Sequence, residues 1–217
     1  MLIWMQGGGQ SSGSAFAIFG NSSSYANMLV VVPDTSTGDC GGWDMSDMSY
    51  ISALIKELKT EYTFDSDHTI LGGFSCGALG VSYYALKQGH QTEFSHLIMA
   101  SGYIDFDLPA ASASSPKVLL VHATDDTFVS YRYAEEAFAS FKASGYDVDL
   151  RSTRGGHNLG SNIVSYMSSY LKKGESSLAS STMGTSASSA NDFSVDTLDG
   201  LPFEAKSPSA GGCFLRR

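Results

Sequence analysis

Short apolar segments alternate with amphipathic segments along most of this 217-residue chain. We expect strands at residues 2–5, 28–32, 68–74, 94–100, 117–122 and 148–152. We expect helices at residues 46–62, 76–87, 129–142 and 163–171. Solidly apolar strands separated by amphipathic helices indicate an α/β fold, a mostly parallel sheet with helices on both faces. Ligands of such sheets bind at the carboxyl ends of the strands, so functional residues should follow these segments directly.

The composition changes sharply after Lys173. Serine, threonine and alanine dominate the next segment, which cannot bury enough apolar surface to offset its ordering entropy. We therefore predict one domain over residues 1–173, a serine-rich linker over 174–191 and a C-terminal extension over 192–217. The extension regains apolar residues, so it is either a strand docked on the domain or a disordered end.

The charge balance argues against two kinds of partner. Lys and Arg number 13 against 22 Asp and Glu, which gives a formal net charge of -9. An acidic surface repels nucleic-acid phosphates and anionic membranes, so we expect neither as a partner. No segment approaches the length of a membrane span, and the first residues lack the features of a signal peptide. Three cysteines are too few for a disulfide framework or a zinc site.

The third expected strand runs into Gly73-Phe74-Ser75-Cys76-Gly77, a G-x-S-x-G pattern. A serine on a sharp turn between a strand and a helix presents its hydroxyl at the sheet edge as a nucleophile. A second match is centred on Ser11, but we expect a serine- and glycine-rich loop after it, so we favour Ser75. The alternative for Ser75 is an ordinary helix N-cap.

A nucleophilic serine needs a base, and the base needs an orienting acid. His157 lies in a glycine-rich loop after the last strand, whereas each other histidine, such as His122 at the end of a core strand, has a simple structural explanation. Asp125 and Asp126 follow the strand at 117–122. We favour Asp126 as the acid, with Asp125 as a helix cap or a supporting residue.

Two backbone N–H groups should hold the oxyanion. The first belongs to Cys76, directly after the nucleophile, and the second comes from the loop after an early strand. That loop is a run of three glycines here, which makes Gly8 and Gly9 the candidates. A triple glycine is otherwise only a flexible turn.

The walls of the site are less clearly marked. Trp43 and Tyr103 both follow strands at their carboxyl ends, so each either contacts substrate or packs within its loop. Cys40 and Cys76 are near enough to the site to approach each other, although we favour a buried free thiol at Cys76.

The order Ser, Asp, His on an alternating sheet resembles the α/β-hydrolase superfamily, in particular small esterases related to polyhydroxybutyrate depolymerases and feruloyl esterases. Residues 5–10 (MQGGGQ) match the His-Gly-Gly/Cys-Gly-Gln loop of that group, with Gln6 in place of the histidine. Residues 122–126 (HATDD) match its His-Gly-Thr-x-Asp segment, with Ala123 in place of glycine and Asp126 at the acid position. Residues 156–158 (GHN) match its histidine loop. That fold has strands before the oxyanion loop, so the resemblance implies that the first strands are lacking here.

We therefore predict a serine esterase that cleaves a small-molecule or polymer-linked carboxylic ester through an acyl-serine intermediate, with no metal and no cofactor. Alternatives are a serine peptidase or an acyltransferase on the same fold, or a non-catalytic hydrolase-like binding module. The resemblance favours an extracellular location, while the sequence indicates no oligomeric state.

Overall fold

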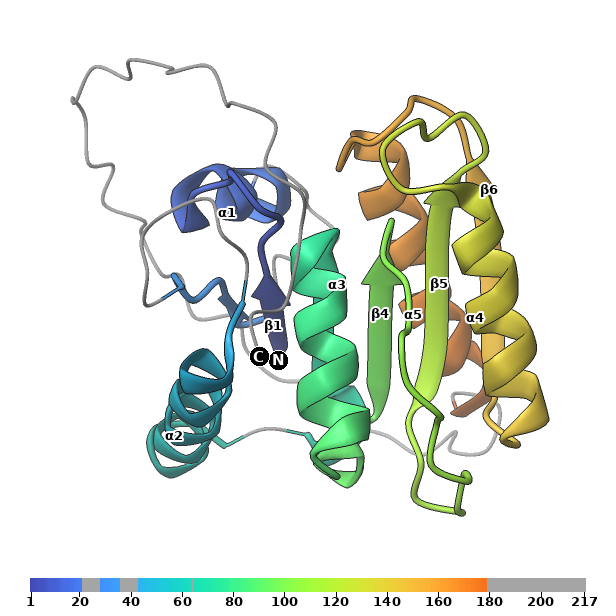
Figure 1. Cartoon of the computed structure of the whole chain (residues 1–217). Coiled ribbons are helices and arrows are strands. Elements are labelled where there is room, and N and C mark those ends of the chain that lie inside the picture. Colours follow the sequence, from blue (N-terminus) through green and yellow to red (C-terminus); the bar gives the residue numbers. More distant parts are fainter. Residues whose placement is uncertain (21–27, 36–42, 64, 179–217) are drawn as a thin grey trace, which may run out of the picture.

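The computed structural model describes residues 1–20, 28–35, 43–63 and 65–178 (Figure 1). Within them, six strands form one sheet in the order β2-β1-β3-β4-β5-β6, and every neighbouring pair is parallel. The strands are β1 (Leu2–Met5), β2 (Val30–Val31), β3 (Ile70–Phe74), β4 (His96–Ala100), β5 (Lys117–Ala123) and β6 (Val148–Thr153). The predicted α/β class and the parallel sheet are confirmed.

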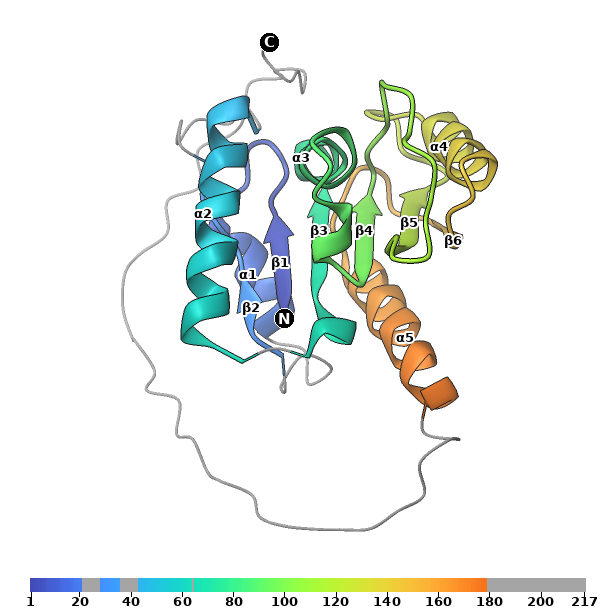
Figure 2. The same cartoon turned by 90° about the horizontal axis from the view of Figure 1, so that it is seen from below.

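Helices cover both faces of this sheet. They are α1 (Ser12–Gly20), α2 (Met45–Glu61), α3 (Cys76–Val81), α4 (Tyr131–Ala143) and α5 (Ser161–Leu178), and α3 continues as a π-helical segment, η3 (Ser82–Lys87). Helices α2, α3 and α4 lie on one face, and α1 and α5 lie on the other (Figure 2). None of the helices described has both the length and the apolar character needed to cross a bilayer.

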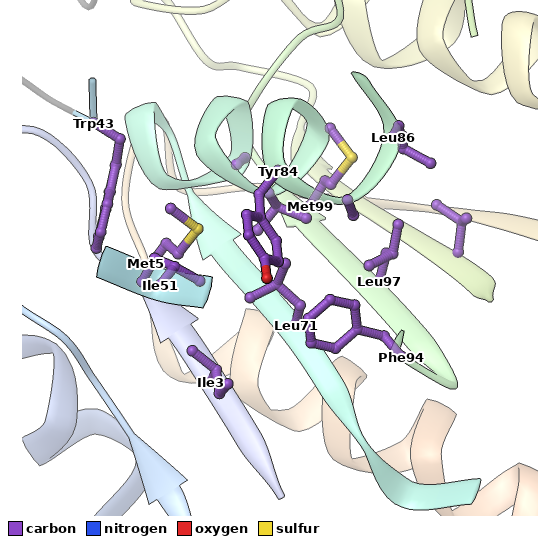
Figure 3. Packing of buried hydrophobic residues seen from close by; sticks show 14 of the residues in the cluster. Ile3, Met5, Trp43, Ile51, Leu71, Tyr84, Leu86, Phe94, Leu97 and Met99 are labelled. Carbon is purple, nitrogen blue, oxygen red and sulfur yellow. The ribbon is translucent and has the colours of Figure 1, made fainter. Parts of the chain in front are cut away.

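Side-chain alternation along the strands divides the core into two clusters. In β1, Ile3 and Met5 pack with residues of α2, α3 and α4, whereas Leu2 and Trp4 pack with residues of α1 and α5. Successive side chains of a strand point to opposite faces, so a strand covered on both sides is apolar at every position. Figure 3 shows the first cluster, in which residues from β1, β3 and β4 meet Trp43, Ile51 and Tyr84.

Two segments differ from the prediction. Residues after Ser11 form the helix α1 instead of a loop, because Ala15 and Phe19, four residues apart, are fully buried against the sheet. Burial of an apolar face outweighs the low helix propensity of serine and glycine there. At the other end, α5 reaches Leu178, so residues 174–178 of the predicted linker are helical. The remaining linker and the C-terminal extension lie outside the described residues.

The junction of β3 and α3 is held by two close backbone approaches. A Cβ atom on Gly73 would overlap the backbone of Gly77, and a Cβ atom on Gly77 would overlap the carbonyl oxygen of Met5. Both clashes are with backbone atoms that cannot rotate away. The two glycines therefore allow α3 to start directly above the ends of β1 and β3.

This packing predicts that Gly77→Ala lowers the free energy of unfolding by about 3 kcal/mol or more, since overpacking against fixed backbone forces strands and helix apart. Gly13→Ala is the matched control. It lies in α1 with open space around its missing side chain, and should be neutral or stabilising by about 0.5 kcal/mol. Urea denaturation of both variants measures the difference, and equal stabilities would contradict the close approach at Gly77.

Candidate active site

Ser75 occupies a strained turn between β3 and α3. Its backbone has φ 54° and ψ -117°, and a positive φ is uncommon for any residue other than glycine. The turn is fixed by a bond from the Ser75 N–H to the Ala100 carbonyl (2.8 Å) and by one from the Leu79 N–H to the Ser75 carbonyl (3.2 Å). The Ser75 side chain makes no capping bond to α3, so the N-cap alternative is wrong.

The hydroxyl of Ser75 is instead joined to the imidazole of His157. The distance from Ser75 Oγ to His157 Nε2 is 2.9 Å, and His157 Nδ1 lies 2.7 Å from Asp126 Oδ2. A carboxylate only accepts hydrogen bonds, so Nδ1 carries the proton of a neutral ring. Nε2 then accepts a hydrogen bond from the serine hydroxyl. The structure thus brings the three predicted residues into one hydrogen-bonded chain.

Aromatic rings flank the imidazole. The Phe74 and Phe128 rings each lie with their centroids 4.9 Å from that of His157. The preceding residues, Gly155 (φ 125°) and Gly156 (φ 66°), turn the loop toward the sheet edge with backbone angles that other residues rarely adopt. Contacts with both rings restrict how the imidazole can rotate.

Asp126 is buried and receives several hydrogen bonds. The backbone N–H groups of Phe128 and Val129 both donate to Oδ1 at 2.9 Å, while Oδ2 faces His157. Its side chain has no exposed surface. Because a buried carboxylate is costly without hydrogen-bond donors, these bonds stabilise Asp126 in its place beside the imidazole.

Asp125 does not cap the following helix, contrary to one of the two roles predicted for it. Helix α4 begins at Tyr131, and Asp125 Oδ1 accepts hydrogen bonds from Gly155 N (3.0 Å) and Gly156 N (3.1 Å). Hydrogen bonds from these N–H groups lower the pKa of the Asp125 carboxyl, and the bond from Gly156 has the larger effect. The adjacent carboxylate therefore supports the loop that carries the histidine.

The oxyanion candidates are the residue after the serine and two glycines in the loop after β1. Cys76 is the first residue of α3, so its N–H points out of the helix N-terminus. The loop with Gly8 and Gly9 passes the elbow, because a Cβ atom on Gly7 would meet the Phe74 ring at 2.8 Å. Both Gly8 and Gly9 are exposed, and Gly9 has φ 78°. Which of the two glycines donates stays a prediction.

Trp43 supports the loop after β1. Its indole N–H donates to the Gln6 carbonyl at 3.0 Å, its ring packs against Gly80, and only 2% of the residue is exposed. These contacts favour the loop-packing alternative for Trp43 over substrate contact. Tyr103 is partly exposed and pairs with Tyr133 at 5.5 Å between ring centroids.

Sequence reasoning missed one residue, Phe128. It is 56% exposed while its ring contacts His157, so it borders the site on the solvent side. Its position in the sequence, two residues after Asp126 and at a strand's carboxyl end, was the available signal.

Cys76 is disulfide-bonded, so the expected free thiol is wrong. Cys40 and Cys213, the other two cysteines, both lie outside the described residues. Among the residues that the structure describes, no three His, Cys, Asp or Glu side chains gather as a metal site would need.

Two curated proteins have sequences similar to part of this chain. The acyl-protein thioesterase 1 homolog 1 of Dictyostelium discoideum is 25% identical over 127 residues, 57% of this chain and 56% of that protein. A bifunctional acetylxylan esterase/xylanase of Neocallimastix patriciarum is 28% identical over 117 residues, 52% of this chain and 17% of that protein. The chain thus spans about half or less of the length of these relatives.

A similar solved structure is that of esterase PE8, with a TM-score of 0.66 at 22% identity, over 79% of this chain and 91% of that one. At this identity the likeness establishes the α/β-hydrolase fold. The family model described as phospholipase/carboxylesterase matches residues 44–174, which is more than half of the sequence. The chain therefore belongs to the phospholipase/carboxylesterase family of α/β-hydrolases.

Proposed function

We propose that the protein is a carboxylic ester hydrolase that works through an acyl intermediate on Ser75. The observation that carries the proposal is the hydrogen-bonded chain from Ser75 Oγ through His157 to the buried carboxylate of Asp126. A non-catalytic module would have no use for the strained backbone of Ser75, because such strain costs on the order of 1 to 3 kcal/mol.

The proposed reaction starts when His157 Nε2 takes the proton of the Ser75 hydroxyl as Oγ attacks the acyl carbon. The Cys76 N–H and the N–H of Gly8 or Gly9 stabilise the resulting oxyanion. The imidazolium then gives its proton to the leaving alcohol, and water releases the acid from the serine by the same steps. Asp126 stays ionised and holds the Nδ1 proton throughout.

Residues beside the imidazole should contact the leaving group, because His157 must reach its oxygen. Phe128 contacts that ring and has a half-exposed surface, so it offers a wall to an apolar or aromatic alcohol. Tyr103, which is partly exposed and pairs with the Tyr133 ring, is the second proposed contact. We propose a small-molecule or polymer-linked ester as the substrate.

Thioester hydrolysis is the second candidate function. One relative is named as an acyl-protein thioesterase, and attack on a thioester carbonyl uses the same nucleophile, base and oxyanion donors. Oxygen esters and thioesters of one acyl chain, compared by kcat/KM, distinguish the two.

Fluorophosphonate labelling tests the nucleophile. We expect a single adduct on Ser75, and we expect Ser75→Ala to abolish labelling and to lower kcat by about 10⁶. Ser11→Ala is the control, because Ser11 Oγ instead pairs with Ser14 at the start of α1, and it should keep full activity. Equal loss in both variants, or an adduct on another residue, would contradict the proposal.

The two adjacent aspartates should differ sharply. Asp126→Asn places an amide where His157 Nδ1–H needs an acceptor, so we expect kcat to fall by about 10⁴ with little change in melting temperature. Asp125→Asn keeps a side-chain oxygen that can accept from Gly155 and Gly156, so it should retain activity within about threefold. Steady-state kinetics that show the reverse order would assign the acid to Asp125.

Removal of the Phe128 ring should weaken binding of bulky esters. For Phe128→Ala we expect KM to rise about tenfold for aryl esters and to change little for methyl esters, because only the larger alcohol buries surface on the ring. Tyr166→Ala removes a comparably exposed ring from α5, on the other face of the sheet, and serves as the control. Equal effects on both ester classes would mean that Phe128 acts only through His157.

A further inference from the structure

We infer that His122 is a positioning residue for the acid. Its neutral imidazole donates from Nε2 and thereby holds Asp126 and its loop in place. The inference rests on the proposed function, since it assigns Asp126 the role of orienting His157.

Two imidazoles approach the same carboxylate oxygen. His122 lies near the end of β5, and only 1% of the residue is exposed. Its Nε2 is 3.3 Å from Asp126 Oδ2, the oxygen that also lies 2.7 Å from His157 Nδ1. The carboxylate is therefore held between a buried histidine on one side and the proposed base on the other.

The protonation state of His122 follows from its partners. Nε2 also lies 2.8 Å from the carbonyl oxygen of Val129. Both neighbours of Nε2 are acceptors, so this nitrogen must carry a proton. Burial lowers the pKa of His122, in opposition to the contributions of Val129 and Asp126, which raise it. A neutral ring with its one proton on Nε2 satisfies both observations.

The same contacts fix the conformation of the loop that carries Asp126. Val129 donates its N–H to Asp126 Oδ1 and accepts the His122 proton on its carbonyl, so both of its backbone polar groups are used. The imidazole is itself fixed by Tyr131, whose ring meets it edge to face at 5.9 Å and whose hydroxyl is 2.6 Å from Ser152 Oγ. His122 therefore connects the rigid strand β5 to the turn that aims the carboxylate.

Neutrality matters for the reaction. A second positive charge beside Asp126 would compete with the imidazolium that forms on His157, whereas an uncharged donor aims the carboxylate without that repulsion. The groups that interact electrostatically with His122 are Asp126 and His157, so its effect should appear in the pH dependence of the base.

The test compares His122→Leu, His122→Gln and a matched control, using kcat, KM and pH profiles on a soluble ester. Leucine removes the donor, and we expect kcat to fall on the order of 10-fold to 100-fold with KM within twofold. The carboxylate charge then acts more strongly on His157, so the acidic limb of kcat/KM should move to higher pH. Glutamine keeps an N–H near the Nε2 position and should restore the wild-type profile and most of kcat.

His96→Leu is the control. His96 is a partly buried histidine at the start of β4, packed against Tyr170, and burial lowers its pKa to about 4. This variant should leave kcat and the pH profile unchanged. An equal loss of kcat in the Leu and Gln variants with an unmoved acidic limb would overturn the inference, as would full activity of a folded His122→Leu.

A measurement on the wild-type chain covers the case in which His122→Leu does not fold. Nitrogen-15 NMR of the histidine side chains should show a neutral ring with its proton on Nε2 of His122 from pH 6 to 9. A proton on Nδ1, or a charged ring at pH 7, would overturn the inference. This result is independent of turnover, whereas failure of Ser75 to label would overturn the proposed function alone.

Discussion

The geometry of the site depends on how closely β1, β3 and α3 approach one another around Ser75. Side chains at Gly73 or Gly77 would occupy the space that backbone atoms of α3 and Met5 already fill. Without that approach the helix could not begin directly after Ser75, and the strained turn at Ser75 would relax. The loop with Gly8 and Gly9 would also move away from the first N–H of α3. One packing constraint therefore sets the places of the nucleophile and of both proposed oxyanion donors.

A second requirement is electrostatic and concerns the buried carboxylate of Asp126. A charge removed from water must find donors within the protein. The turn after β5 supplies two backbone N–H groups, and His157 supplies a third donor. Asp125, exposed next to it, instead binds the backbone that leads to His157. The two neighbouring carboxylates thus hold the same loop in different ways. Asp126 binds the imidazole of His157, and Asp125 binds the main chain before it.

The sequence allowed the sheet and the central residues to be predicted because both leave local patterns. Strand β3 and most of β5 are apolar, and Ser75, Asp126 and His157 each lie within a few residues of the end of a strand. Features that depend on distant contacts were missed. The burial that makes α1 a helix comes from the sheet, and the contact of Phe128 with His157 joins residues far apart in sequence.

Contacts that depend on where another loop lies in space were also beyond the sequence. Adjacent aspartates carry the same chemistry, so the partners of Asp125 could only be found once the histidine loop had a position in space. Trp43 likewise lies in a glycine-rich segment of the sequence, a position compatible with substrate contact or with packing. Its bond to the Gln6 carbonyl shows that it supports the loop. The disulfide of Cys76 could not be deduced from three scattered cysteines.

The separation of these residues along the chain bears on how the protein folds. Ser75 and His157 are 82 positions apart, and Asp126 and His157 are 31 apart, so no local segment holds more than one member of the hydrogen-bonded chain. Parallel strands gain their contacts only after long loops have closed, which makes such sheets slow to assemble. The histidine loop follows β6, an outer strand of the sheet. During refolding, the proposed ester hydrolysis would therefore return only once β6 has docked on β5.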